Sequence, residues 1–143
     1  MLWLSHSGER WVFLLDNANL AFHEAGHPLF GLISDSLAVY GGTLGQLMFP
    51  LAAGVSFYRE RASLSFAFAM LWFGENLFNI SRYMADARAQ LLPLVGGGEH
   101  DWTEIFTRWG VLAWDGQIAT LVRLAGWALI ASALLWLSRC RRA

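Results

Sequence analysis

Four long apolar segments make up most of the sequence and leave few folds open to it. They cover approximately residues 11–33, 37–58, 62–84 and 118–137. Each is close to the roughly 20 residues that a helix needs to cross a bilayer. Hydrophobic residues form 56% of the chain and charged residues only 15%, which is too little charge to cover a soluble domain of this size. We therefore predict an all-α fold with residues 1–143 as one domain, a polytopic membrane helical bundle with about four transmembrane helices.

Two clusters of arginine predict how this bundle is oriented in the membrane. One is the stretch RER at residues 59–61, between the second and third segments, and the other is RCRR at residues 139–142, after the fourth. Basic residues collect on the cytoplasmic side of membrane proteins, so both clusters are expected there. With an even number of spans, both termini are then cytoplasmic.

Two features of the second segment predict how it packs. The stretch GGTLG, residues 41–45, has no bulky side chains at three of its five positions, which favours close approach of another helix. Pro50 lies inside the same segment and predicts a bend, because proline removes a helical hydrogen bond.

A short helix is expected within the connection formed by residues 85–117. Three glycines at 96–98 form a hinge, and the stretch DWTE that follows fits a capping box with Asp101 as the N-cap. Apolar residues then recur at helical spacing: Trp102, Ile105, Phe106, Trp109 and Leu112. The pattern is typical of an interfacial amphipathic helix with tryptophans at headgroup level. A helix packed on the ends of the spans fits it equally well.

The stretch HEAGH inside the first segment carries the strongest chemical signal. It matches the pattern H-E-x-x-H, in which His23 and His27 lie one helical turn apart and can bind one metal ion. Glu24 is offset by one residue and can act as a general base toward water. Imidazole ligands favour zinc (Zn2+), and ionisable groups at membrane depth are costly and usually functional. We therefore interpret His23 and His27 as metal ligands and Glu24 as catalytic, rather than all three as core polar residues.

A catalytic zinc site needs a third protein ligand, and the sequence offers two. Polar residues recur along one face of the third segment: Glu75, Asn79, Tyr83 and Asp86. A similar stripe in the first segment includes both histidines, so the two stripes are expected to face each other. Asp86 would then complete the site. His100, just before the predicted short helix, is the alternative, either as a ligand or as a donor to the transition state.

Two roles are open for Asn79. Its amide can hold the substrate backbone or polarise a carbonyl, which would make it catalytic. It can equally join two helices by a hydrogen bond within the bundle.

Composition excludes several other functions. The net charge of −1 and the lack of a basic stripe argue against a nucleic-acid partner. The single cysteine, Cys140, excludes an internal disulfide and any metal site of the CxxC type.

The stretch FHEAGH, followed two segments later by Asn79 and Asp86 near a helix end, resembles the site-2 protease (M50) family of intramembrane zinc metalloproteases. The run from FHEAGHPLFG through GGTLGQLMFPL to GGGEHDW is similar to the small bacterial M50B-like subgroup. This resemblance covers residues 11–137. It implies zinc, activation of water by the glutamate, and cleavage of a peptide bond in or beside a bacterial cell (inner) membrane.

Carried over by position, the resemblance makes His23, His27 and Asp86 the zinc ligands and Glu24 the base. The stretch NISRYMADAR around Asp86 has neither the prolines nor the glycine of the family's third-ligand motif, so His100 remains the alternative.

The leading hypothesis is a zinc-dependent intramembrane metallopeptidase in which Glu24 activates water and His100 or Asn79 assists the transition state. Its partners would be the lipid bilayer and a membrane-associated peptide or protein substrate. The alternatives are a non-catalytic metal-binding membrane protein and a metal-dependent membrane hydrolase that acts on lipid. Glu24 favours an enzyme, because a site that only binds metal needs no base beside its histidines. The sequence indicates neither the substrate nor the oligomeric state.

Overall fold

The computed structural model describes residues 13–92, 94 and 99–140, and within these residues the chain is all-α with no strand. The four long helices are α1 (Phe13–Gly31), α2 (Asp35–Arg59), α3 (Ser63–Ala85) and α5 (Asp115–Cys140). Between α3 and α5 lie the short helix α4 (Asp101–Arg108) and a 3₁₀ turn, η1 (Leu112–Trp114). The all-α prediction is confirmed, and each apolar segment corresponds to one long helix. The glycine hinge predicted at 96–98 lies outside the described residues.

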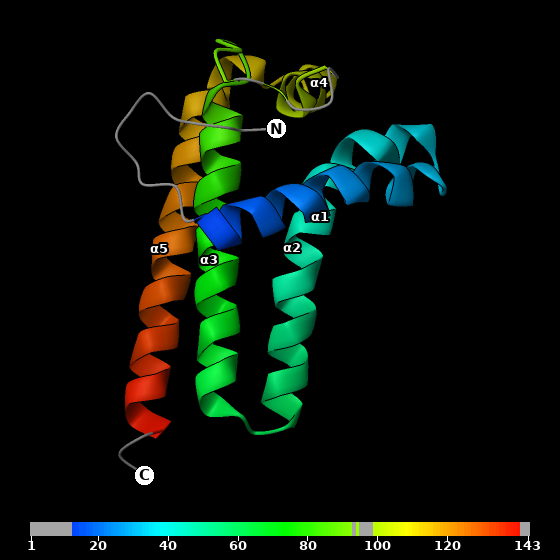
Figure 1. The fold of residues 1–143 in the computed structure, drawn as a ribbon. Helices are drawn as coiled ribbons and strands as arrows, with labels where there is room; N and C mark the ends of the chain where they lie inside the picture. The colour runs from blue at the N-terminus through cyan, green and yellow to red at the C-terminus, as the bar shows by residue number, and fades with distance from the viewer. Residues whose placement is uncertain (1–12, 93, 95–98, 141–143) are drawn as a thin grey trace.

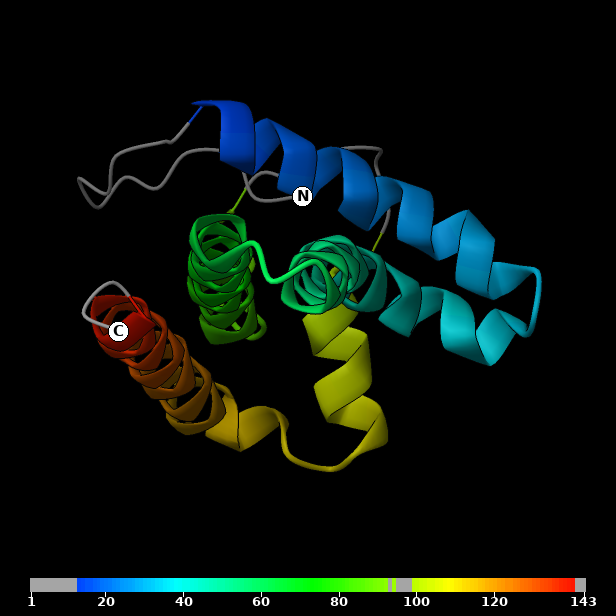
Figure 2. The same cartoon turned by 90° about the horizontal axis from the view of Figure 1, so that it is seen from below.

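The long helices do not all run in one direction. Figure 1 shows α3 and α5 side by side along most of their length, with the second part of α2 on the other side of α3. α2 bends, so that its first part lies beside α1 (Figures 1 and 2). α1 runs along this first part of α2 but across α3 and the second part of α2 (Figures 1 and 2). α4 lies toward one end of the bundle, and the turn between α2 and α3 lies at the other end, together with the C-terminal end of α5.

Glycines explain the close crossing of α1 and α2. A Cβ atom built on Gly26 would lie 2.0 Å from the carbonyl oxygen of Gly41, and one on Gly45 would lie 2.5 Å from that of Phe22. No side chain larger than hydrogen fits between these backbones, so the predicted close approach at GGTLG is confirmed. This contact places the histidines of α1 directly over α2.

The short helix α4 packs on the end of α3. Its residues Trp102, Ile105 and Phe106 are buried and form one core with Met84 and Ala87, which lie at and just after the end of α3. Packing on the helix ends was one of the two positions expected from the sequence. Its apolar face is therefore turned inward, and Trp109, the C-cap, donates a hydrogen bond to the Tyr40 hydroxyl of α2 while 55% of it stays exposed.

One helical stretch in the described part of the chain, Leu112–Cys140, is long enough and apolar enough to cross a membrane. Only 17% of its most apolar window is buried in the protein, so most of its surface faces outward. The stretch consists of η1 and α5. Because α1 lies across the bundle, the arrangement differs from one in which all four apolar segments run in parallel.

Candidate metal centre

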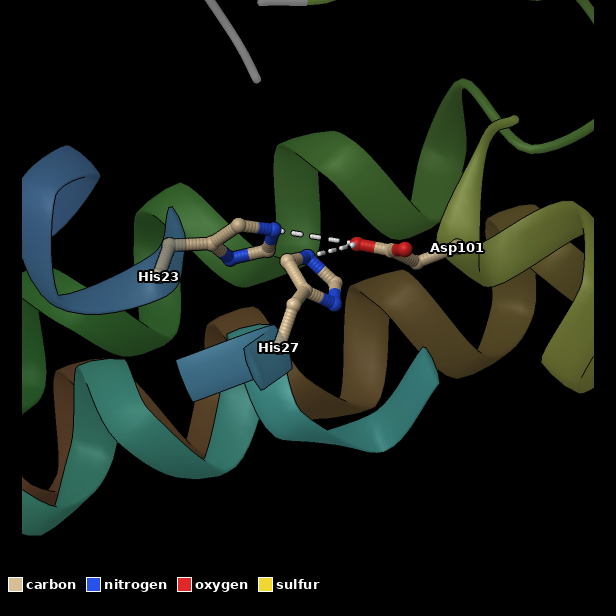
Figure 3. Close-up of side chains that lie close together, drawn as sticks. All are labelled: His23, His27 and Asp101. Atoms are coloured by element: carbon tan, nitrogen blue, oxygen red, sulfur yellow. Dashed lines mark hydrogen bonds and ion pairs between the residues drawn. The ribbon is translucent and has the colours of Figure 1, made fainter. Parts of the chain in front are cut away.

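His23 and His27 converge with Asp101, a residue 78 positions away from His23 in the chain. The Nε2 atoms of His23 and His27 lie 3.0 Å and 3.4 Å from the same carboxylate oxygen of Asp101. Figure 3 shows both rings directed toward that oxygen. The three ligand atoms all lie within 4.8 Å of one another. Zinc bonds of about 2.0–2.1 Å in a tetrahedron separate neighbouring ligand atoms by roughly 3.3 Å, so these spacings fit one ion.

The other ring nitrogens establish which atoms face the centre. His27 Nδ1 lies 2.8 Å from the carbonyl oxygen of Ala38, and His23 Nδ1 lies 3.3 Å from the side-chain oxygen of Gln46. A carbonyl oxygen only accepts hydrogen bonds, so each Nδ1 donates its proton and each Nε2 is the ring nitrogen that faces Asp101. Hydrogen bonds of this kind orient the histidine ligands of metals. Two imidazole nitrogens and a carboxylate oxygen thus meet at one point, and with the ring protons on Nδ1 both Nε2 atoms would be open to a metal cation.

Gly42 of α2 provides the room for this convergence. A Cβ atom at Gly42 would lie 2.5 Å from Nε2 of His23 and 2.7 Å from Nε2 of His27. Only glycine allows α2 to pass this close to both nitrogens. The site is therefore built by α1, α2 and α4 together.

Asp101 is held as an anion in a buried position. Burial alone would raise its pKa, but hydrogen bonds with His23 and His27 lower the pKa of Asp101 to about 2. Its backbone N–H donates to the hydroxyl oxygen of Tyr83 at 3.1 Å. The ring of Tyr83 also contacts His23, with 5.9 Å between ring centroids. Tyr83 therefore connects α3 to two of the three converging residues.

Because α4 begins at Asp101 itself, the Asp101 side chain is not needed as the helix cap and can contact the two histidines. The N-cap of α4 is His100, whose Nδ1 accepts a hydrogen bond from the backbone N–H of Thr103 at 3.3 Å. The prediction that Asp101 is the N-cap is therefore wrong by one residue. As the first residue of the helix, Asp101 has a side chain that is not used for capping and reaches α1.

The structure also differs from the sequence prediction at Asp86. Its two carboxylate oxygens accept hydrogen bonds from the backbone N–H groups of Leu91 and Leu92, at 2.9 Å and 3.0 Å. These bonds stabilise the turn that follows α3. Asp101, and not Asp86, therefore lies with the two histidines. Asp101, directly after His100, was the available sequence signal for the acidic member of this group, but its position before a helical pattern predicts a cap instead.

His100 lies beside this site rather than in the group of three. Its Nε2 is 3.5 Å from a carboxylate oxygen of Asp86 and makes no hydrogen bond within the described residues. Burial lowers the pKa of His100 even though Asp86 is close, so the ring is neutral at pH 7. His100 thus acts as a helix cap, and its role as a transition-state donor stays a prediction.

Asn79 belongs to a different polar group between α1 and α3. Its amide nitrogen donates to Asp16 at 2.9 Å, and Asn19 in turn donates to Glu75 at 2.7 Å. These bonds join the two helices, which was one of the two roles expected of Asn79. Its predicted catalytic role stays a prediction.

Glu24 directly follows His23 in α1 and is half-buried. Its charge acts on both His27 and Tyr83, so the carboxylate is near the converging residues. His23, Glu24 and His27 thus share one region of the fold.

Comparison of the chain with family models, with curated proteins and with solved structures found no match. The assignment of a function therefore rests on the residues and the geometry described above.

Proposed function

We propose that the protein is a zinc-dependent intramembrane metallopeptidase that hydrolyses a peptide bond in a membrane-associated substrate. The observation that carries the proposal is the convergence of His23, His27 and Asp101 on one point above Gly42. Two imidazoles and one carboxylate are a ligand set that catalytic zinc sites use, with a further position left for water or substrate. The adjacent Glu24 favours catalysis over metal binding alone.

The residues of the metal centre and its neighbours have distinct parts in this proposal. His23, His27 and Asp101 would hold the ion, while Gln46 and Ala38 keep the imidazoles in the tautomer that offers Nε2. When bound, zinc supplies a Lewis acid that lowers the pKa of water and polarises a carbonyl group. Glu24 accepts the proton of the attacking water and delivers it to the leaving amine.

The membrane location is part of the same proposal. Large apolar side chains are exposed on the outer faces of three helices: Leu51 and Val55 of α2, Leu64 and Phe68 of α3, and Leu121, Leu124, Trp127 and Leu135 of α5. Soluble monomers rarely expose so many together, whereas a bilayer would cover them. We propose a multi-pass protein of a bacterial cell (inner) membrane with both termini in the cytoplasm.

The test combines metal content with turnover. The full-length protein, purified in a mild detergent, is expected to contain about one zinc per chain by elemental analysis, since there is a single group of ligands. His23→Ala should lose the zinc. Glu24→Gln should keep the zinc but lose hydrolysis of fluorogenic membrane-tethered peptides in proteoliposomes. Glu104→Gln, which removes the charge of a partly exposed glutamate paired with Arg108, is the matched control and should behave like the unmodified protein.

Three results would contradict the proposal or narrow it to an alternative. A folded protein free of zinc after growth with added zinc would reject the metal site. Full hydrolysis by the Glu24→Gln variant would reject the base. Zinc retention with release of fatty acid from vesicle lipid, and no peptide cleavage, would point instead to a lipid hydrolase.

A further inference from the structure

A cavity of about 440 Å³ lies at the end of the bundle opposite α4, where the turn between α2 and α3 meets α5 (Figure 1). Its lining combines aromatic and basic side chains in a small space: Phe57, Tyr58, Phe66 and Trp136 with Arg59 and Arg61. None of these residues belongs to the metal centre.

The walls of this cavity are aromatic. The rings of Phe66 and Trp136 meet edge to face at 4.8 Å between centroids, and Tyr58 packs against Phe66 at 5.6 Å. These contacts connect α2, α3 and α5. Tyrosine and tryptophan prefer the headgroup level of a bilayer, where one side of the ring is apolar and the other is wet.

The rim of the cavity is positively charged. Arg59 and Arg61 are both exposed, and neither takes part in an ion pair among the described residues. Glu60, which lies between them, instead accepts a hydrogen bond from the Ser56 hydroxyl at 3.0 Å. The two guanidinium groups are therefore available to an external anion.

The backbone adds to this positive potential. α3 begins at Ser63, and its N-cap is Ala62, which has no side-chain oxygen to accept from the first N–H groups. Helix N-termini attract anions. Arg61 itself has a left-handed backbone with φ of 56°, a conformation that disfavours arginine relative to glycine. An arginine at that position is consistent with a use for its side chain.

We propose that this cavity binds the phosphate headgroup of an anionic phospholipid, through Arg59 and Arg61. Guanidinium groups bind phosphate in a bidentate manner, and basic pockets between membrane helices hold anionic headgroups. The acyl chains would lie along the exposed apolar surface that continues from Tyr58 at helical spacing on α2, which includes Val55 and Leu51. We favour a lipid over free phosphate as the ligand, because the two arginines border aromatic and aliphatic surface that a free anion would not use. The helix α5, which could span a membrane, also ends here.

The experiment titrates the full-length protein in neutral detergent with three probes and follows thermal unfolding. The probes are short-chain phosphatidylglycerol, short-chain phosphatidylcholine with the same acyl chains, and inorganic phosphate. We expect phosphatidylglycerol to raise Tm by roughly 3 °C or more, as a ligand that binds only the folded state does, and the other two to raise it much less. The double variant Arg59→Gln/Arg61→Gln should lose most of this shift. Arg123→Gln, which removes an exposed arginine of α5 outside the cavity, should keep it.

Several outcomes would overturn the inference. Equal shifts from phosphatidylglycerol and phosphatidylcholine would show that headgroup charge is not recognised. A shift of the same size from inorganic phosphate would assign the site to a free anion. An undiminished shift in the double variant would place the lipid elsewhere. Lipid phosphorus bound per chain after extraction from mixed phosphatidylglycerol and phosphatidylcholine vesicles gives a second measurement, and it is independent of zinc content.

Discussion

Gly42 lies so close to His23 that a single added methyl group would come within 2.5 Å of the ring nitrogen Nε2. The same methyl group would come within 2.7 Å of Nε2 of His27. The side chain of Gly42 is a single hydrogen atom, and any larger side chain at this position would contact both proposed ligands. This relationship makes Gly42 a sensitive probe of the metal centre.

We expect Gly42→Ala to weaken zinc binding by at least about tenfold, as loss of ligand orientation does in other sites. The added Cβ would meet both Nε2 atoms, so the imidazoles or α2 must shift and the two rings lose their present alignment. Competition with a chelating zinc indicator measures the change. Gly116→Ala is the matched control, because a Cβ there meets nothing within 4 Å. Equal zinc affinity in both variants would contradict the close packing described for Gly42.

Substitution of the two aspartates should separate their roles. Asp101→Ala removes a proposed ligand, so we expect loss of most bound zinc by elemental analysis. Asp86→Ala leaves the N–H groups of Leu91 and Leu92 without their acceptor, which should lower the free energy of unfolding by about 1–3 kcal/mol. Zinc should remain in this variant. The opposite pattern, with zinc lost only from Asp86→Ala, would restore the original sequence prediction.

Tyr83→Phe tests whether the tyrosine hydroxyl positions Asp101. The substitution keeps the ring against His23 but removes the oxygen that accepts from the Asp101 backbone N–H. We expect zinc affinity to fall by about tenfold while the helical circular dichroism is unchanged. Tyr58→Phe removes an exposed hydroxyl at the other end of the bundle and should have no effect on zinc. An unchanged affinity in Tyr83→Phe would limit the residue to packing.

The pH dependence of zinc binding should arise from the histidines alone. The pKa of Asp101 is lowered to about 2, so this carboxylate is ionised throughout the range from pH 5 to pH 8. Protonated imidazole cannot bind a metal, and its ordinary pKa is about 6.5. Zinc affinity should therefore fall as the pH drops through about 6.5, with a limiting slope of about two protons per ion at lower pH. A slope near one, measured by competition titration at several pH values, would mean that a single histidine binds the ion.

The sequence by itself determined the local features of this protein. Apolar runs of about 20 residues are helical because the chain must satisfy its own backbone hydrogen bonds, and each run corresponds to a helix. The placement of His23 and His27 on one face follows from the helical repeat and needs no knowledge of the rest of the chain. The glycines at 41, 42 and 45 likewise predict a close helix contact, because small residues allow it wherever the partner is.

Only the tertiary structure decided which carboxylate joins the histidines. Asp86 and Asp101 are both acidic residues near helix ends, and no local pattern distinguishes a ligand from a residue that stabilises a turn. The choice depends on where α4 begins, since His100 takes the cap and releases Asp101 toward α1. It also depends on the crossing of α1 over α2, which brings residues 78 positions apart within 3.0 Å. Contacts of this kind arise from the packing of whole helices. The short-range periodicity of a sequence does not predict them.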